Sequence, residues 1–156
     1  MRTIVLIALC VAGWAASSSA DDAPTLADGR WAGQFGGTSL ASGRCSDHKN
    51  CTLTLDIIPC GEQWCGIRID DAGGCTGNVL RLGSVSRPDN AQSYVGELKL
   101  MEGTAPYTLR AWMRKGDNGQ PELRLIGDSG GKFLSRTFSF HAVLARTGDA
   151  RCREIS

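Results

Sequence analysis

Residues 51–69 read CTLTLDIIPCGEQWCGIRI and hold two alternating runs joined by a short turn. In the first run, Leu53, Leu55 and Ile57 share one face, and polar residues alternate with them on the other. In the second run, a cysteine and two isoleucines repeat the period of two that is typical of a β-strand. The short connection favours an antiparallel hairpin. This stretch therefore predicts a β-protein.

The same alternation recurs along the rest of the chain. Further strands are predicted at residues 30–35, 78–85, 94–100, 106–114, 122–126 and 137–145, which makes eight with 51–58 and 64–69. Short turns rich in Gly, Pro, Asp and Asn separate them, so neighbours in sequence should pair antiparallel in space. One apolar face per strand fits a sheet closed around its own core, without exposed edges. We predict an all-β, eight-stranded up-and-down barrel, lipocalin-like in plan. A two-sheet β-sandwich is the alternative.

The first twenty residues have the plan of a signal peptide. Arg2 precedes a nearly unbroken apolar run, and the small residues Ser18, Ser19 and Ala20 end it. A membrane anchor needs about 20 apolar residues, and this run is shorter. We therefore predict a signal peptide over 1–20, a flexible arm over 21–28 and one barrel domain over 29–156. The protein should lie in the periplasm or be secreted, without a membrane span.

Charge excludes some classes of partner. Arg2 is the only charged residue of the leader, so the remaining chain has 16 basic and 16 acidic residues. A neutral domain is not drawn to nucleic acid.

Six cysteines follow the leader: Cys45, Cys51, Cys60, Cys65, Cys75 and Cys152. An even number behind an export signal indicates a disulfide framework, although sequence alone leaves fifteen pairings open. The geometry of the predicted strands reduces the number of plausible pairings. A hairpin would bring Cys60 to Cys65, and Cys45 and Cys51 bracket a polar loop. Cys75 is then left for Cys152.

A metal site at Cys45, His48 and Cys51 is the competing interpretation of that loop. Its spacing does not match the close cysteine pairs of structural zinc sites. We predict neither a metal nor a cofactor.

Residues 127–131 read GDSGG, the pentapeptide around the nucleophile of chymotrypsin-like proteases. A catalytic serine needs a histidine base and an acid behind it. The chain offers only His48 and His141, in sequence contexts unlike those of that family. We predict that residues 128–131 form a hairpin turn and that the chain has no catalytic residue. A serine hydrolase using Ser129 is kept as an alternative.

A possible binding surface involves two tryptophans. Trp112 falls on the polar face of its strand between Arg110 and Arg114, and an exposed tryptophan among arginines is typical of a partner-binding patch. Trp64 lies in the cysteine-flanked hairpin and is included in this surface. Trp64 also fits the barrel core or the lining of a ligand cavity, as does Trp31.

Several of these motifs occur together in a known family. Gly29-Arg30-Trp31, the segment CGEQWCGI over 60–67, and the run from Pro88 through YVGELKL over 94–100 follow in that order. This pattern resembles the exported bacterial domain-of-unknown-function family two-one-four-seven. The resemblance spans about residues 29–111. It implies a secreted, lipocalin-like barrel and brings no agreed activity. Departures include Leu144-Ala145-Arg146 in place of the family's tryptophan-arginine ending.

Three functions follow from these observations. The favoured one is a non-enzymatic, monomeric exported protein that binds a small ligand or an envelope or secreted protein partner. The second is an inhibitor of a protease or lysozyme that uses the 21–28 arm or the loop between Cys45 and Cys51. The third is the serine hydrolase.

Overall fold

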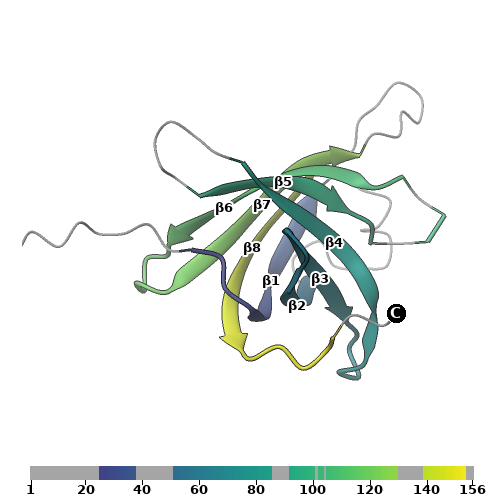
Figure 1. The fold of residues 1–156 in the computed structure, drawn as a ribbon, viewed down its shortest axis with the longest axis horizontal. Helices are drawn as coiled ribbons and strands as arrows, with labels where there is room; N and C mark the ends of the chain where they lie inside the picture. The colour runs from purple at the N-terminus through teal and green to yellow at the C-terminus, as the bar shows by residue number, and fades with distance from the viewer. Residues whose placement is uncertain are drawn as a thin grey trace, which may run out of the picture.

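The computed structural model describes residues 25–37, 51–85, 92–100, 102–103, 105–129 and 139–153. Its strands are β1 (Gly29–Gly37), β2 (Thr52–Cys60), β3 (Gln63–Ile69), β4 (Cys75–Val85), β5 (Ser93–Leu98), β6 (Tyr107–Lys115), β7 (Pro121–Ser129) and β8 (Ser139–Gly148). Each strand pairs antiparallel with the next, and β1 also pairs with β8, so the sheet closes (Figure 1). The predicted eight-stranded up-and-down barrel is confirmed, and the β-sandwich alternative is wrong.

The observed strand bounds differ from the predicted ones by up to three residues, and the differences at β4 and β7 bear on the predictions. Strand β4 begins at Cys75 rather than at Asn78, because its ladder with β3 shifts register twice and so breaks the simple alternation. Strand β7 runs to Ser129, which pairs with Tyr107 on β6. The prediction that the hairpin turn begins at Asp128 is therefore wrong, because Asp128 and Ser129 still belong to the ladder.

The inward faces of the strands form one continuous apolar core. Its most buried members have no exposed surface: Leu55, Ile57, Leu82, Leu98, Leu123, Leu125 and Leu144. Burial of one such side chain contributes about 1.5–3 kcal/mol, so this cluster is the main source of stability. The inward side chains of the described strands thus pack against one another.

The predicted arm joins this core at its end. Leu26 is only 5% exposed and belongs to the same buried cluster as Trp31. The Nε1 atom of Trp31 donates a hydrogen bond to the carbonyl oxygen of Ala27 at 3.2 Å. Residues 26–27 therefore close one end of the barrel; residues 21–24 of the arm lie outside the described residues.

A second, smaller apolar cluster lies on the outside of the barrel. Ile67 and Ile69 of β3 are buried with Cys152, and Ile58 of β2 packs against them. The alternation of β3 correctly places its isoleucines on one face, but that face points outward. The segment after β8, residues 149–153, covers it, and we call this segment the C-terminal strap.

Asp56 holds the strap against β2. Its carboxylate is 0% exposed and accepts hydrogen bonds from Arg30 Nε (2.7 Å) and Arg30 Nη2 (2.9 Å). It also accepts hydrogen bonds from the backbone nitrogens of Arg151 and Cys152, both at 2.7 Å. Burial alone would raise the pKa of Asp56, but the hydrogen bonds from Arg30, Cys152 and Arg151 outweigh it and hold this pKa below its usual range.

Two disulfides match the predicted pairing. Cys60 and Cys65 clamp the β2–β3 hairpin, and Cys75 at the start of β4 is bonded to Cys152 in the strap. Cys51 is also disulfide-bonded. Its predicted partner, Cys45, lies outside the described residues.

Glycines allow two close approaches that the barrel needs. A Cβ atom on Gly33 of β1 would lie 1.9 Å from the carbonyl oxygen of Val143 on β8. A Cβ atom on Gly96 of β5 would lie 1.8 Å from the carbonyl oxygen of Arg81 on β4. Only glycine fits such contacts between backbones, which occur where a sheet bends sharply to close.

Candidate binding surface on the outer face of β5 to β8

Outward side chains of β5, β6, β7 and β8 line up in two rows across the barrel. In one row, Val95 lies opposite Arg110, and Arg110 lies opposite Ile126. In the other row, Trp112 lies opposite Arg124, and Arg124 lies opposite Val143. We call this surface the outer patch and define it by six residues: Val95, Arg110, Trp112, Arg124, Ile126 and Val143.

The outer patch holds three of the four exposed large apolar side chains among the described residues. Ile126 is 52% exposed, Val95 48% and Val143 37%. The remaining exposed large apolar side chain among the described residues is Val85 on β4, cross-strand to Ser93 of β5 at the border of the patch. Single exposed aliphatic residues are ordinary, but their gathering on one side of a barrel is typical of an interaction surface.

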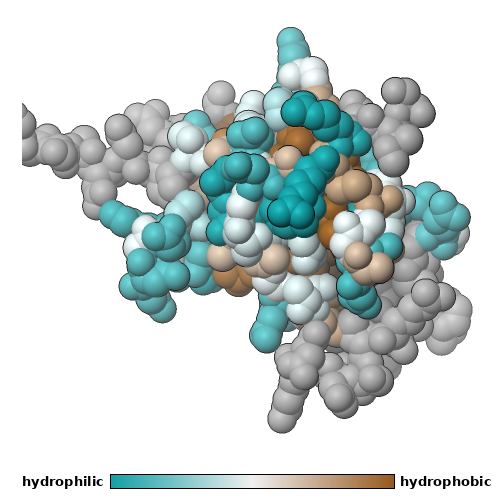
Figure 2. All heavy atoms as spheres, turned by 90° about the horizontal axis from the view of Figure 1, so that it is seen from below, coloured by the Kyte–Doolittle hydropathy of each residue, from teal (hydrophilic) through white to brown (hydrophobic). Residues whose placement is uncertain are grey.

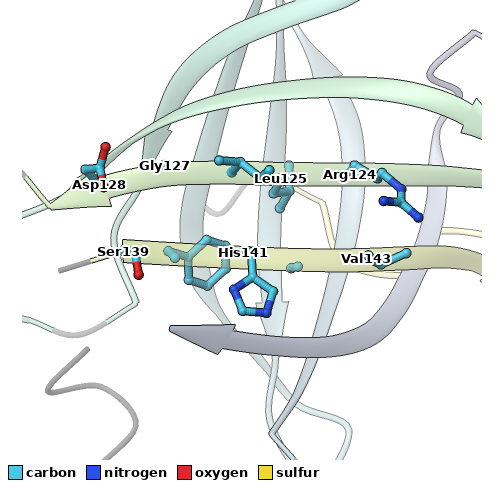
Figure 3. A pocket seen from close by; sticks show the side chains of 10 residues that line it. Arg124, Leu125, Gly127, Asp128, Ser139, His141 and Val143 are labelled. Carbon is cyan, nitrogen blue, oxygen red and sulfur yellow. The ribbon is translucent and has the colours of Figure 1, made fainter. Parts of the chain in front are cut away.

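Two open depressions flank the patch. One, of about 450 Å³, lies over β7 and β8, and Figure 3 shows Arg124 and Val143 at one end of it and Asp128 and Ser139 at the other. The second, of about 560 Å³, extends over β4, β5 and β6. Val95 and Trp112 line it. The surface over the patch is therefore uneven, with a depression on each side of β6 and β7.

Polar atoms are mixed with apolar ones across the molecular surface. On the face drawn in Figure 2, hydrophobic atoms in brown emerge between hydrophilic atoms in teal. Within the outer patch the polar members are cationic. Arg110 makes no ion pair with any described residue, and both of its cross-strand neighbours are aliphatic.

Glu122 lies at the border of the patch between two further arginines. Its Oε2 atom is 3.2 Å from Arg114 Nε and 3.6 Å from Arg124 Nη2. Neither contact has hydrogen-bond geometry, and Arg114 Nε, Arg124 Nε and Glu122 Oε2 are buried without a hydrogen-bond partner among the described residues. One carboxylate therefore faces two guanidinium groups, and the arginines retain unused donors.

The structure brings together three of the four predicted surface residues. Arg110, Trp112 and Arg114 all point outward from β6, with Trp112 half-buried. Trp64 is elsewhere: it is half-buried on β3 and packs against the barrel core. Trp31 is 1% exposed and belongs to that core.

The aliphatic members of the patch carried a signal that sequence reasoning did not use. Val95, Ile126 and Val143 occupy positions that the alternation assigns to the polar faces of their strands. A β-branched residue at such a position is unremarkable alone. Three such residues indicate a common surface only once the strand register shows that they lie on the neighbouring strands β5, β7 and β8 around β6.

The serine motif is not assembled with His141. Ser129 is 7% exposed on the inward side of β7, whereas His141 points outward from β8, with its ring over Gly36 of β1. The barrel wall therefore lies between the hydroxyl group and the imidazole. His48, Gly130 and Gly131 lie outside the described residues.

The described residues contain no cluster of three or more His, Cys, Asp or Glu side chains arranged to hold a metal ion. Asp70 caps a turn: its Oδ1 accepts hydrogen bonds from the backbone nitrogens of Ala72 and Gly74. Among the same residues, no helix is long and apolar enough to cross a membrane.

Comparison of the chain with protein-family models and with curated proteins gave no match. The resemblance to family two-one-four-seven thus stays a prediction.

Proposed function

We propose that this chain is a non-enzymatic protein of the periplasm or the extracellular space that binds a protein partner of the envelope or the secreted fraction through the outer patch. The observation that carries this proposal is the gathering of Val95, Ile126 and Val143 around Arg110 and Trp112 on one side of the barrel. Protein interfaces are enriched in tryptophan and arginine, surrounded by contacts that exclude water.

The disulfides support the proposed compartment. The Cys60–Cys65 and Cys75–Cys152 bridges, with a bonded Cys51, are typical of proteins that fold in an oxidising environment. The resemblance to an exported bacterial family points the same way.

The core favours a surface role over a small ligand inside the barrel. Leucine side chains from several strands meet in the interior with no exposed surface, and Leu26 closes one end. A ligand of drug size needs a cavity of about 300–1,000 Å³, and the buried leucines among the described residues leave no exposed surface of their own to line one.

The inhibitor function would use segments that are mostly outside the described residues. Of the 21–28 arm, the structure describes residues 25–28, and Leu26 among them is buried in the core. A free arm would therefore have to be the part before Leu26. This observation favours the outer patch as the binding site.

Site-specific photo-crosslinking in the cell that exports the protein tests the proposal. A photoreactive amino acid at Val95 or Ile126 should give adducts with an exported protein. The same amino acid at Thr52, which is exposed on β2, should not. An Ile126→Asp substitution should remove the adduct formed from position 95. Equal adducts from Thr52, or none from the patch, would overturn the proposal.

A further inference from the structure

The acidic and basic side chains on the outer face of β5 to β8 lie in separate rows next to Arg110. The row next to that of Arg110 also points outward. In it, Glu97 of β5 and Asp128 of β7 each lie opposite Thr108 of β6, one on either side of that strand. On the other side of the patch lies Glu122. The cationic band from Arg110 to Arg114 is therefore bordered by two carboxylates on the Arg110 side, and Glu122 lies opposite Arg114 at its other end.

From this pattern we infer that the outer patch binds an acidic, apolar-flanked segment of a protein, with Arg110 meeting a carboxylate of that segment. The inference rests on the proposed function and names the chemistry of its partner. A guanidinium group forms paired hydrogen bonds with a carboxylate, and here it stands between two aliphatic side chains that would shield those bonds from water.

Unused donors in the patch point to the same chemistry. Arg124 Nε is buried without a hydrogen-bond partner among the described residues, and its contact with Glu122 is long, at 3.6 Å from Nη2. The side chain of Arg124 is nevertheless 31% exposed, so the outer part of its guanidinium group can still meet a carboxylate supplied by a partner.

The bordering carboxylates favour a protein segment over an anionic membrane. Residues two apart along a strand are separated by about 6.8 Å, so the band from Arg110 to Arg114 is only about 14 Å wide. A bilayer rich in anionic lipid would extend beyond the band and press negative headgroups against Glu97 and Asp128. A polypeptide can confine its negative charge to the width of the band.

Fluorescence anisotropy with labelled synthetic peptides tests the inference. The probes are an amphipathic peptide that alternates Asp or Glu with Leu and Val, and two versions with Gln or Lys in place of the acids. The acidic peptide should bind most tightly, and its affinity should fall several-fold when salt rises from about 0.05 to 0.5 M. Vesicles of phosphatidylglycerol serve as the competing anionic surface.

Three substitutions separate the possible outcomes. Arg110→Gln should weaken binding of the acidic peptide about tenfold, the size of effect expected for losing one charge-assisted contact. Arg81→Gln, which removes an exposed arginine opposite Glu97 on β4, should leave it unchanged. Ile126→Ser should weaken the binding of all peptides.

If Ile126→Ser weakens binding but the acidic and Gln peptides bind alike and Arg110→Gln has no effect, the patch is a binding site and the acidic preference is wrong. Preferential, Arg110-dependent binding to the vesicles would also overturn the inference. If no peptide binds, or if Ile126→Ser leaves the affinity of every peptide unchanged, both the inference and the proposed function are wrong. Circular dichroism of each variant checks that the barrel is retained.

Discussion

Replacing Asp56 with asparagine should destabilise the barrel far more than other charge-neutralising changes. The Oδ2 atom accepts three hydrogen bonds, from Arg30 Nη2, Arg151 N and Cys152 N, and Oδ1 accepts one from Arg30 Nε. Asparagine keeps one oxygen for the three donors at Oδ2 but presents an NH2 group to Arg30 Nε. One charge-assisted hydrogen bond is then lost, and three become bonds to a neutral acceptor.

The cost can be worked from these contacts. A charge-assisted hydrogen bond contributes about 1.5–3 kcal/mol and a neutral one about 1 kcal/mol. Losing one charge-assisted bond and weakening three others should together lower the free energy of unfolding by about 3 kcal/mol. This value is at the lower end of the range for breaking a buried ion pair, because the Arg30 side chain is 21% exposed and keeps contact with water. For a domain of this size, the melting temperature should fall by about 10 °C.

Thermal unfolding of the oxidised protein at pH 7, followed by circular dichroism, measures this effect. Asp117→Asn is the matched control, because Asp117 also faces an arginine, Arg114 at 3.8 Å, but its side chain is fully exposed. The control variant should have the same melting temperature as the wild type. If Asp56→Asn also melts within about 2 °C of the wild type, the assignment of Asp56 as the anchor of the strap is refuted.

The same carboxylate makes a prediction about pH. Because the pKa of Asp56 is lowered in the folded state, its stabilisation is complete above the unfolded value of about 3.9 and is lost as the pH falls through the folded value. The difference in melting temperature between the wild type and Asp56→Asn should be constant near neutral pH and shrink below about pH 4. A difference that persists unchanged at pH 2 would contradict the reasoning.

Two further predictions concern stability. Removing the Cys75–Cys152 bridge by alanine substitutions should cost about 4 kcal/mol in urea unfolding, and removing the Cys60–Cys65 bridge about 2 kcal/mol, because the first closes a loop of 77 residues and the second one of 5. The reverse order would show that native contacts, not loop length, set the cost. Gly33→Ala should destabilise strongly, since its Cβ would overlap the Val143 carbonyl oxygen, whereas Gly148→Ala has open space and should fold normally. Equal melting temperatures for the two glycine variants would refute this reading of the β1–β8 contact.

The fold was predictable because its core follows a local rule. Alternation of the kind in Leu53, Leu55 and Ile57 reports which side of a strand is apolar, and short turns report which strands are neighbours. The rule does not say whether an apolar face points into the barrel. Ile67 and Ile69 obey the period but face outward, because the C-terminal strap covers them.

Local sequence patterns could not predict the contacts between distant parts of the chain. Asp56 stands at a polar-face position and is nevertheless fully buried, because a segment 95 and 96 residues later in the chain donates to it. In the candidate site, the alternation within β6 alone predicts that Trp112, Arg110 and Arg114 share one face of the strand. The register of three strands, β5, β6 and β7, is needed before Val95 and Ile126 join them.

The Cys75–Cys152 bridge also has a mechanical consequence. Strands β4 to β8 lie within a covalent ring closed by this bond, so tension applied along the chain passes through the disulfide and bypasses those strands. The chain between Cys75 and Cys152 cannot then be drawn out by force, and about 260 Å of extended chain stays locked in the ring until a reductant opens it. In a single-molecule pulling experiment on the wild type, the contour length released should therefore increase by at least that amount when dithiothreitol is added, because the other disulfides open as well.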